Sequence, residues 1–401
     1  MMMRNKSRSL WTLALVAGFA VVAPARVYAS VGAAAGAEWD GDESDKLFNT
    51  EKVLRLSVEL GQAELESLRK EPRKYVKCSM KVGDVAYEDV GIHVKGGVGS
   101  FRPIDAKPAL TLNMKKFKKG QRFHGLGKFH LSNSVQDPTY LSEFIGGQLF
   151  RAAGVPASRI THVVVTVNGK QRGLYYLKEG YDSQFLKRHF KNDRGNLYDG
   201  GYLTDLNAPL QLLSGKMDVK DRADLKALWE AAHEKDLAVR FQRLNKLLDM
   251  DRFISYLAME IITFDWDSYP ISRNNYRVFH DPDKDKITFF PSGMDQILRP
   301  NAPSWLFPVA PWAFQGAVAR KLMETPEGKK RYVARVRALM QATYRPDALC
   351  KRVDEMAARI QVVLADVDPA AAKRHPKDIE DLRFGIRLRA KQMDEQLRKV
   401  P

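Results

Sequence analysis

The hydrophobic pattern of this chain changes period part-way along its length, and this change most limits the folds that it can adopt. Before about residue 180, short alternating apolar runs typical of β-strands are joined by two hairpin signals, Gly83-Asp84 and Asn168-Gly169. From Asp221 onwards, apolar residues recur every three or four positions, which is the period of an α-helix. A sheet-rich segment followed by a helix-rich one predicts an α+β fold. With 401 residues, of which 44% are hydrophobic, the chain can form one large domain or two ordinary ones.

The first 29 residues have the anatomy of a cleaved secretory signal peptide. A basic start is followed by an apolar run from Leu10 to Val22 and by small residues near Ala29. An uncleaved anchor is the weaker interpretation, because this run is shorter than the ~20 residues that a membrane span needs. We therefore expect a protein exported to the periplasm, the cell surface or the medium. Residues 30–46 would form a leader, and no membrane span would remain after cleavage.

The chain contains two cysteines, Cys78 and Cys350. An exported protein meets an oxidising compartment, in which the two thiols could pair. Their wide separation in the sequence leaves the alternative of two buried free thiols open.

The chain is strongly basic. Its formal net charge is +17, and removal of the first 29 residues, which hold four basic residues and no acids, would leave +13. A charge of this size favours acidic partners such as nucleotides, acidic proteins or anionic polymers. The basic run 115–119 contains one aromatic residue and could suggest nucleic-acid binding. It is short and belongs to no recognised nucleic-acid fold, so we expect a solvated turn and no nucleic-acid partner.

Two acids flank a predicted hairpin in the helix-rich half. Asp267 precedes the β-prone segment 275–280, and Asp295 follows the β-prone segment 287–290. The turn residues between these segments should fold the backbone back and bring the two acids together. Divalent-metal phosphoryl transfer needs one acid to orient the nucleophile, and a second acid with an amide to hold Mg²⁺ against the phosphates. Asn274 and Asn275 are the candidate amides.

A glycine-rich turn follows one of the predicted strands. Glycines allow backbone N–H groups to approach an anion closely, as in phosphate-binding loops, although a plain β-turn is the alternative. The turn is made by Gly96, Gly97, Gly99 and Ser100.

A lysine and a glutamate could complete a nucleotide site beside this turn. Lys107 heads the next predicted strand, and Glu143 lies near the start of a predicted helix. Kinases pair a nucleotide-positioning lysine with an acid on such a helix, so we predict that Lys107 pairs with Glu143. A surface acid favoured by the helix dipole is the alternative for Glu143.

At these residues the chain resembles the CotH family of spore-coat-type atypical protein kinases. Family members carry an Asp before a His/Asn-Asn-Tyr strand, here 274–276, and a second Asp in a Trp-Asp-x-Asp or Gly-Met-Asp turn, here 293–295. The resemblance extends more loosely from about Leu47 to about Leu397. Two features differ, because Lys95-Gly96-Gly97-Val98 stands where many members have Arg-Gly-Asn-Ser, and the first acid of the second motif is absent.

The resemblance implies a two-lobed, protein-kinase-like fold. The sheet-rich N-lobe would span residues 47–180, the helical C-lobe residues 181–399, and the hinge would fall near Lys178 to Tyr181. It further implies ATP and Mg²⁺ or Mn²⁺ as cofactors. Asp267 would be the catalytic base, with Asp265 in reserve, and Asp295 the principal metal ligand.

The implied function is transfer of the ATP γ-phosphoryl group to Ser or Thr hydroxyls of a protein substrate, which could be acidic. The main alternative is a non-catalytic member of the family, a surface or envelope protein used for binding or assembly. A polyanion-binding wall or matrix protein is a third interpretation, which rests on charge alone.

Overall fold

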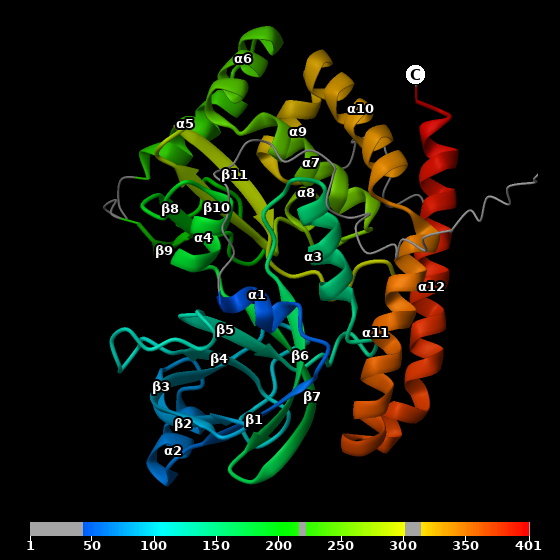
Figure 1. Cartoon of the computed structure of the whole chain (residues 1–401). Helices are drawn as coiled ribbons and strands as arrows, with labels where there is room; N and C mark the ends of the chain where they lie inside the picture. The colour runs from blue at the N-terminus through cyan, green and yellow to red at the C-terminus, as the bar shows by residue number, and fades with distance from the viewer. Residues whose placement is uncertain (1–42, 216–221, 301–313, 401) are drawn as a thin grey trace, which may run out of the picture.

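The computed structural model describes residues 43–215, 222–300 and 314–400, and within them a β-barrel lies at one end and most helices at the other (Figure 1). The predicted signal peptide lies outside the described residues, as does the predicted leader except for its last four residues. These four belong to the first helix, α1 (Glu43–Phe48).

Seven strands close into the barrel in the order β1-β2-β3-β4-β5-β7-β6. Adjacent strands pair antiparallel, except that β1 and β6 pair parallel and so complete the closure. The two predicted hairpins join β2 to β3 and β6 to β7, which confirms both turn signals. The strands are β1 (Leu54–Glu59), β2 (Val76–Val82), β3 (Val85–Lys95), β4 (Ala109–Asn113), β5 (Lys128–Ser132), β6 (Ile160–Val167) and β7 (Lys170–Glu179).

The second half of the chain is helical, but it also holds a four-stranded sheet of order β11-β10-β8-β9 that the sequence indicated only in part. The predicted hairpin forms two of its strands, β10 (Tyr276–Asp281) and β11 (Lys286–Pro291). The others are β8 (Asn196–Asp199) and β9 (Gln211–Ser214). The helices are α2 (Gln62–Lys70), α3 (Ser142–Ala152), α4 (Ser183–His189), α5 (Ala223–Ala232), α6 (Leu237–Leu247), α7 (Met250–Ile262), α8 (Tyr269–Ser272), α9 (Ala317–Met323), α10 (Pro326–Ala342), α11 (Pro346–Val367) and α12 (Pro369–Leu397).

Alternation along β7 divides its side chains between two hydrophobic cores. Tyr175 and Leu177 belong to the core inside the barrel, whereas Leu174 and Tyr176 belong to the core shared with α3 and the helices. Successive side chains of a strand point to opposite faces, so Lys178 lies on the same face as Tyr176. This parity directs Lys178 towards α3.

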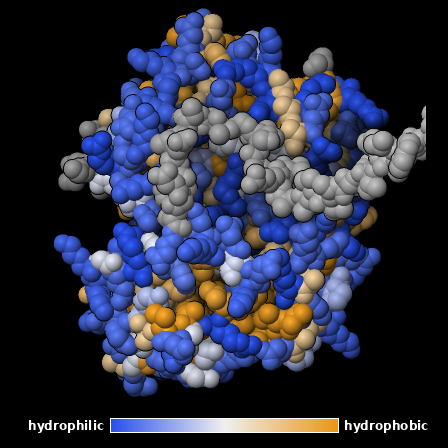
Figure 2. All heavy atoms as spheres, viewed as in Figure 1, coloured by the Kyte–Doolittle hydropathy of each residue, from blue (hydrophilic) through white to orange (hydrophobic). Residues whose placement is uncertain are grey.

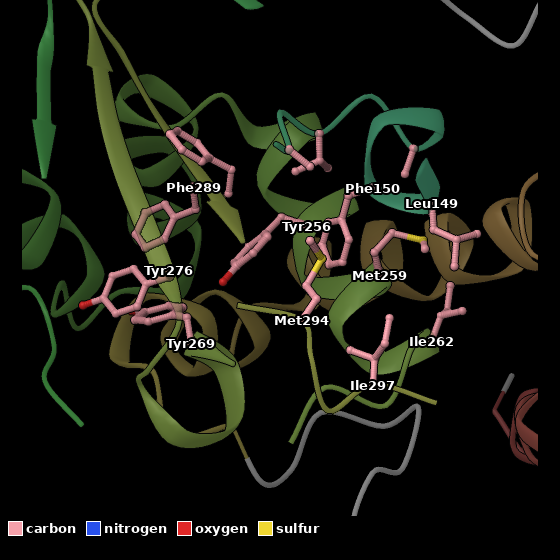
Figure 3. Close-up of a cluster of buried hydrophobic side chains, with 14 of the residues drawn as sticks. Leu149, Phe150, Tyr256, Met259, Ile262, Tyr269, Tyr276, Phe289, Met294 and Ile297 are labelled. Carbon is pink, nitrogen blue, oxygen red and sulfur yellow. The ribbon is translucent and has the colours of Figure 1, made fainter. Parts of the chain in front are cut away.

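The buried helix α7 anchors the predicted catalytic hairpin. Tyr256 of α7 packs against Phe289 of β11 with ring centroids 6.3 Å apart, and Phe289 stacks on Tyr276 of β10 at 6.0 Å. Figure 3 shows these rings in one cluster with Met294, which belongs to the turn that carries Asp295. The hairpin and the following turn therefore rest on a packed aromatic core.

These observations confirm the predicted α+β fold, while the division into two lobes at residue 180 stays a prediction. Cys78 and Cys350 are both buried free thiols, which matches the second interpretation given from the sequence and not a disulfide. The basic run 115–119 is an exposed turn, as expected. The described helices include none with the length and hydropathy of a transmembrane span.

Candidate active site

The segment after α7 places Asp267 between two asparagine side chains. The Nδ2 groups of Asn274 and Asn275 donate to Oδ1 and Oδ2 of Asp267 at 3.0 and 2.9 Å. Burial raises the pKa of the half-buried Asp267 carboxyl, and the two amide hydrogen bonds oppose that rise. Both carboxylate oxygens are thus held in a fixed orientation. The Oδ1 atoms of the two asparagines are not used in these two hydrogen bonds and can ligate a cation.

Asn275 also connects Asp267 to the turn that carries Asp295. Its carbonyl oxygen accepts from Ser292 N–H at 2.8 Å. Its carboxamide fills the space beside Gly293, where an added Cβ would lie 2.8 Å from Asn275 Oδ1. Such a separation is well inside van der Waals contact, so a glycine is needed for this close approach. The hairpin thus brings the two ends of the predicted site together.

Asp265, the reserve candidate for the base, is unsuited to that role because it is 2% exposed. Its Oδ1 accepts the Asp267 backbone N–H at 3.1 Å. Burial, together with the charges of Asp267 and Asp295, raises its pKa well above the usual range. Asp265 therefore positions the loop from inside the protein.

A buried ion pair joins α3 to β7 at the centre of the site. Lys178 Nζ lies 3.0 Å from both carboxylate oxygens of Glu143, and each side chain is 4% exposed. Lys178 also donates to the Ser292 carbonyl, and Glu143 accepts the Met294 backbone N–H at 3.1 Å. The pair therefore binds α3, β7 and the turn before Asp295 to one another.

The predicted pairing of Lys107 with Glu143 is wrong. Lys107 Nζ lies 3.5 Å from the Tyr140 hydroxyl and sits 5.4 Å from the ring centroids of Tyr140 and Tyr175. Tyr175 belongs to the barrel core, on the opposite face of β7 from Lys178. Lys107 is thus directed away from Glu143, and strand parity explains why Lys178 takes its place.

Sequence reasoning missed Lys178 as a site residue and treated the segment from Lys178 to Tyr181 as a hinge without chemistry of its own. A partial signal was present, because Lys178 ends an apolar strand at the same parity as Tyr176, which the structure places in the core shared with α3. A lysine rarely occupies such a position without an acidic partner.

Asp295 lies close to this ion pair. Burial, followed by the charges of Glu143 and Asp137, raises the pKa of the Asp295 carboxyl to about 6, although the charge of Lys178 opposes the rise. Lys95, at the end of β3, is part of the same electrostatic group. Burial and the charge of Lys178 lower the Lys95 pKa to about 8, whereas Glu143 and Asp295 oppose that shift.

Further basic groups border the same region. Arg277 on β10 donates to Asp199 Oδ1 at 2.9 Å and to Ser292 Oγ at 3.1 Å. The charges of Lys95, Lys128 and Arg277 all lower the pKa of His130, although burial lowers it most. None of these three basic residues was among the predicted site residues, although Lys95 heads the segment that stands where many CotH members have Arg-Gly-Asn-Ser. Together with Lys178 these groups concentrate positive charge around His130, next to Asp295, and positive charge suits phosphate groups.

The glycine-rich turn begins immediately after Lys95. Ser100 Oγ accepts the Gly97 N–H at 3.0 Å, and the N–H groups of Ser100 and Phe101 are directed to the Gly97 carbonyl at 3.3 and 3.0 Å. These internal bonds use three of the amides that a phosphate would need. Gly96 and Gly99 have φ of 109° and 82°, values that favour glycine. The role of this turn in nucleotide binding stays a prediction.

The donors of this site suit a divalent cation that completes its shell with non-protein ligands. Within the described ranges, no three His, Cys, Asp or Glu side chains lie close enough to form a metal site of protein ligands alone. Mg²⁺ typically takes one or two carboxylates and completes its shell with water and substrate phosphates. Asp295, with the Oδ1 of an asparagine, fits that mode.

A comparison with protein families assigns the chain to a class of protein. A family model described as "CotH kinase protein" matches residues 92–397, and the chain belongs to this family.

The chain is similar to curated proteins of the fungus Rhizopus delemar. It is 22% identical to "Spore coat protein homolog 1" over 316 residues, or 73% of this chain and 51% of that protein. It is 26% identical to "Invasin CotH3" over 187 residues, or 42% of this chain and 31% of that protein. The matches thus span between about a third and a half of these relatives' length.

Two solved structures show weaker likeness. A structure of the Shewanella oneidensis MR-1 toxin–antitoxin HipA, HipB and operator DNA complex has a TM-score of 0.35 and 12% identity, covering 88% of this chain and 75% of that chain. The Helicobacter pylori proinflammatory kinase CtkA has a TM-score of 0.25 and 10% identity, covering 65% and 93%. At TM-scores below 0.5, neither structure bears on the function of this chain.

Proposed function

We propose that this protein is an ATP-dependent protein kinase that uses Mg²⁺ or Mn²⁺. The observation that carries the proposal is the buried Lys178–Glu143 ion pair, which is hydrogen-bonded to the turn before Asp295. A lysine held by an acid on a helix, next to a metal-binding acid, is the arrangement with which kinases position the phosphates of ATP. Membership of the CotH kinase family supports the same function.

Each polar group then has a role that follows from its contacts. Asp267, held by Asn274 and Asn275, would accept the proton of the acceptor hydroxyl while its carboxylate stays oriented. Lys178 would hold its positive charge beside the nucleotide phosphates, since its three N–H groups are taken by Glu143 and Ser292, and Lys95 would add a second positive charge. When bound, ATP and its cation supply the transferable phosphoryl group and the charge that neutralises it.

Asp295 would be the principal ligand of the cation. A carboxyl whose pKa is raised to about 6 by burial and by neighbouring acids gains from a nearby cation, which favours the ionised form. Asn275 Oδ1 would be the second protein ligand. The turn at Gly96 to Ser100 would cover the phosphates.

We further propose that the protein is exported and acts on proteins outside the cytoplasm. Its relatives bear the names spore coat protein homolog and invasin, and the N-terminal 29 residues have the pattern of a signal peptide. The net charge favours an acidic protein acceptor.

A second candidate function is a non-catalytic surface or assembly protein. It is favoured by those relatives' names, which describe a coat and invasins rather than an enzyme. Retention of Asp267 between its two asparagines, together with Asp295, favours the kinase.

The test is transfer of label from ATP by the purified protein in Mg²⁺ and then in Mn²⁺, with acidic and basic protein acceptors. Asp267→Asn and Asp295→Asn should each abolish transfer. Asp285→Asn, at the exposed tip of the same hairpin, removes an acid of equal charge and should leave transfer unchanged.

Two other outcomes would contradict the kinase. If ATP raises the melting temperature of the protein but no label moves with any acceptor, the protein is a nucleotide-binding member without catalysis. If ATP has no effect on the melting temperature, the surface-assembly function stands.

A further inference from the structure

A cavity of about 320 Å³ lies on the side of α3 away from Glu143. Its walls come from α3, from α11, from the start of β6 and from the connection between α1 and β1 (Figure 1). Four arginines line it, Arg151, Arg159, Arg352 and Arg359, and the single acid in its walls is Glu51. Figure 2 shows the same view of the molecule, in which hydrophilic residues predominate among the coloured ones.

Two helices contribute matching stripes to this cavity. Phe144, Gln148 and Arg151 are spaced four and three residues apart on α3, and the α11 residues that line it, from 352 to 359, have the same spacing. Residues at this spacing lie on one face of a helix. Arg352 sits 5.1 Å from the Phe144 ring centroid and so joins the two stripes at one end.

Arg151 is held in the cavity wall without an acidic partner. Its Nη1 donates to the carbonyls of Ala157 and Ser158 at 3.2 and 2.6 Å, and among the described residues no carboxylate forms an ion pair with it. Gly147 makes room for this guanidinium, since an added Cβ would lie 3.0 Å from Arg151 Nη1. Burial and the charges of Arg188 and Arg159 lower the Arg151 pKa to about 10, and the charge of Glu179 opposes this shift only in part.

The other arginines are held by contacts of two kinds. Arg159 is committed to the buried Glu179 and to Asp45. Arg359 and Arg352 pair with acids that a ligand can displace: Glu51, whose side chain is 82% exposed, and Glu355. Exposed ion pairs of this kind contribute only about 0–1 kcal/mol. An anion in the cavity would replace them at little cost.

We propose that this cavity is a binding site for a phosphoryl group, carried by a small molecule or by a phosphorylated side chain. Guanidinium groups converge on the cavity from two helices. Several guanidinium groups match a tetrahedral dianion, which has several acceptor oxygens, whereas the two oxygens of a planar carboxylate are satisfied by one bidentate guanidinium. Its volume is at the lower limit of about 300–1,000 Å³ for ligand pockets, which suits a phosphoryl group with a small attachment. No step of the proposed kinase reaction uses this cavity.

The test is calorimetric titration of the full chain with inorganic phosphate and with O-phosphoserine at constant ionic strength. Replacing Arg352 and Arg359 together by glutamine should weaken phosphate binding about tenfold or more, because each hydrogen bond to a charged group contributes strongly. Lys351→Gln, an exposed position on the same helix outside the cavity, is the matched control and should change binding less than twofold.

The variants also separate this cavity from the candidate active site. Lys95→Gln should leave phosphate binding at the cavity intact and weaken that of ATP. Three results would each overturn the site. They are equal phosphate affinity of wild type and the Arg352/Arg359 variant, equal weakening of phosphate binding by Lys351→Gln, and no binding of phosphate to the wild-type protein. Tighter binding of O-phosphoserine than of phosphate would assign the ligand to phosphorylated side chains, and the reverse order to free phosphate or small phosphorylated molecules.

Discussion

Replacement of Lys178 by methionine should lower the free energy of unfolding by about 3–5 kcal/mol, the cost of removing one partner of a buried ion pair. The magnitude follows from burial, because both Lys178 and Glu143 have 4% exposed side chains and water cannot replace the lost partner. Glu143 would keep the Met294 N–H at 3.1 Å but lose both 3.0 Å contacts to Lys178. It would then interact with the Asp295 charge without its direct cationic partner, and Lys95 would be the remaining cation of this group.

Urea unfolding followed by circular dichroism at pH 7 measures this change. Lys170→Met, at the exposed start of the same strand, is the control for loss of a lysine and should stay within about 0.5 kcal/mol of wild type. Glu143→Gln completes a double-mutant cycle with Lys178→Met. A coupling of about 1–3 kcal/mol is expected for groups in one network.

Two results would refute this reasoning about the ion pair. The first is a decrease in the free energy of unfolding of Lys178→Met that is no larger than the decrease measured for Lys170→Met. The second is strict additivity of Lys178→Met and Glu143→Gln, since the buried pair would then contribute nothing beyond its separate side chains.

Gly293→Ala should reduce the rate of phosphoryl transfer about tenfold or more, because the added methyl group displaces Asn275 from Asp267. In a kinetic double-mutant cycle, Gly293→Ala should cause little further loss of rate in the Asn275→Ala background, and additive effects would contradict this explanation. Burial lowers the pKa of His162 to about 4, so between pH 6.5 and 4 His162 binds a proton in the unfolded chain but not in the folded protein. Stability should therefore fall by about 3 kcal/mol as the pH drops through this range, and urea unfolding of His162→Gln should show a shallower fall; equal pH dependence in both proteins would be the contrary result. The thiols of Cys78 and Cys350 should react with a disulfide reagent only after unfolding, because both are buried and burial raises the pKa of Cys78 to about 12; rapid reaction in the folded protein would contradict this.

Local sequence signals predicted the elements of this fold well because each depends on a few neighbouring residues. The turn at Asn168-Gly169 has φ of 47° and 70°, the left-handed values that these two residues tolerate best. The closure of the barrel was beyond such signals. It depends on parallel pairing of β1 with β6, in which Leu56 meets Val165, and no local pattern specifies a contact over such a distance in sequence.

The candidate site was predicted where the residues are close in sequence and was missed where they are not. Asp267 and its two asparagines lie within nine residues on either side of the short helix α8, and the structure brings them together. The partner of Glu143 depends instead on which face of β7 turns towards α3. Tyr175 and Tyr176 point into different cores, and Lys178 shares the side of Tyr176, so this alternation selects Lys178 as the partner of Glu143. The selection requires knowledge of where α3 packs, which the sequence does not provide.

The charges of the site lead to one more expectation, that a divalent cation and ATP bind cooperatively. A cation alone meets Lys95 and Lys178 beside Asp295, and a polyanion alone meets Asp295 and Glu143, so each ligand is opposed by charges that the other one neutralises. Coupling between sites is reciprocal, and a typical coupling of about 1–3 kcal/mol corresponds to about 5–150-fold in affinity. Titration of ATP with and without Mn²⁺ measures it. The coupling should be lost in Asp295→Asn, which removes the principal cation ligand, and an undiminished effect of Mn²⁺ in that variant would place the cation elsewhere.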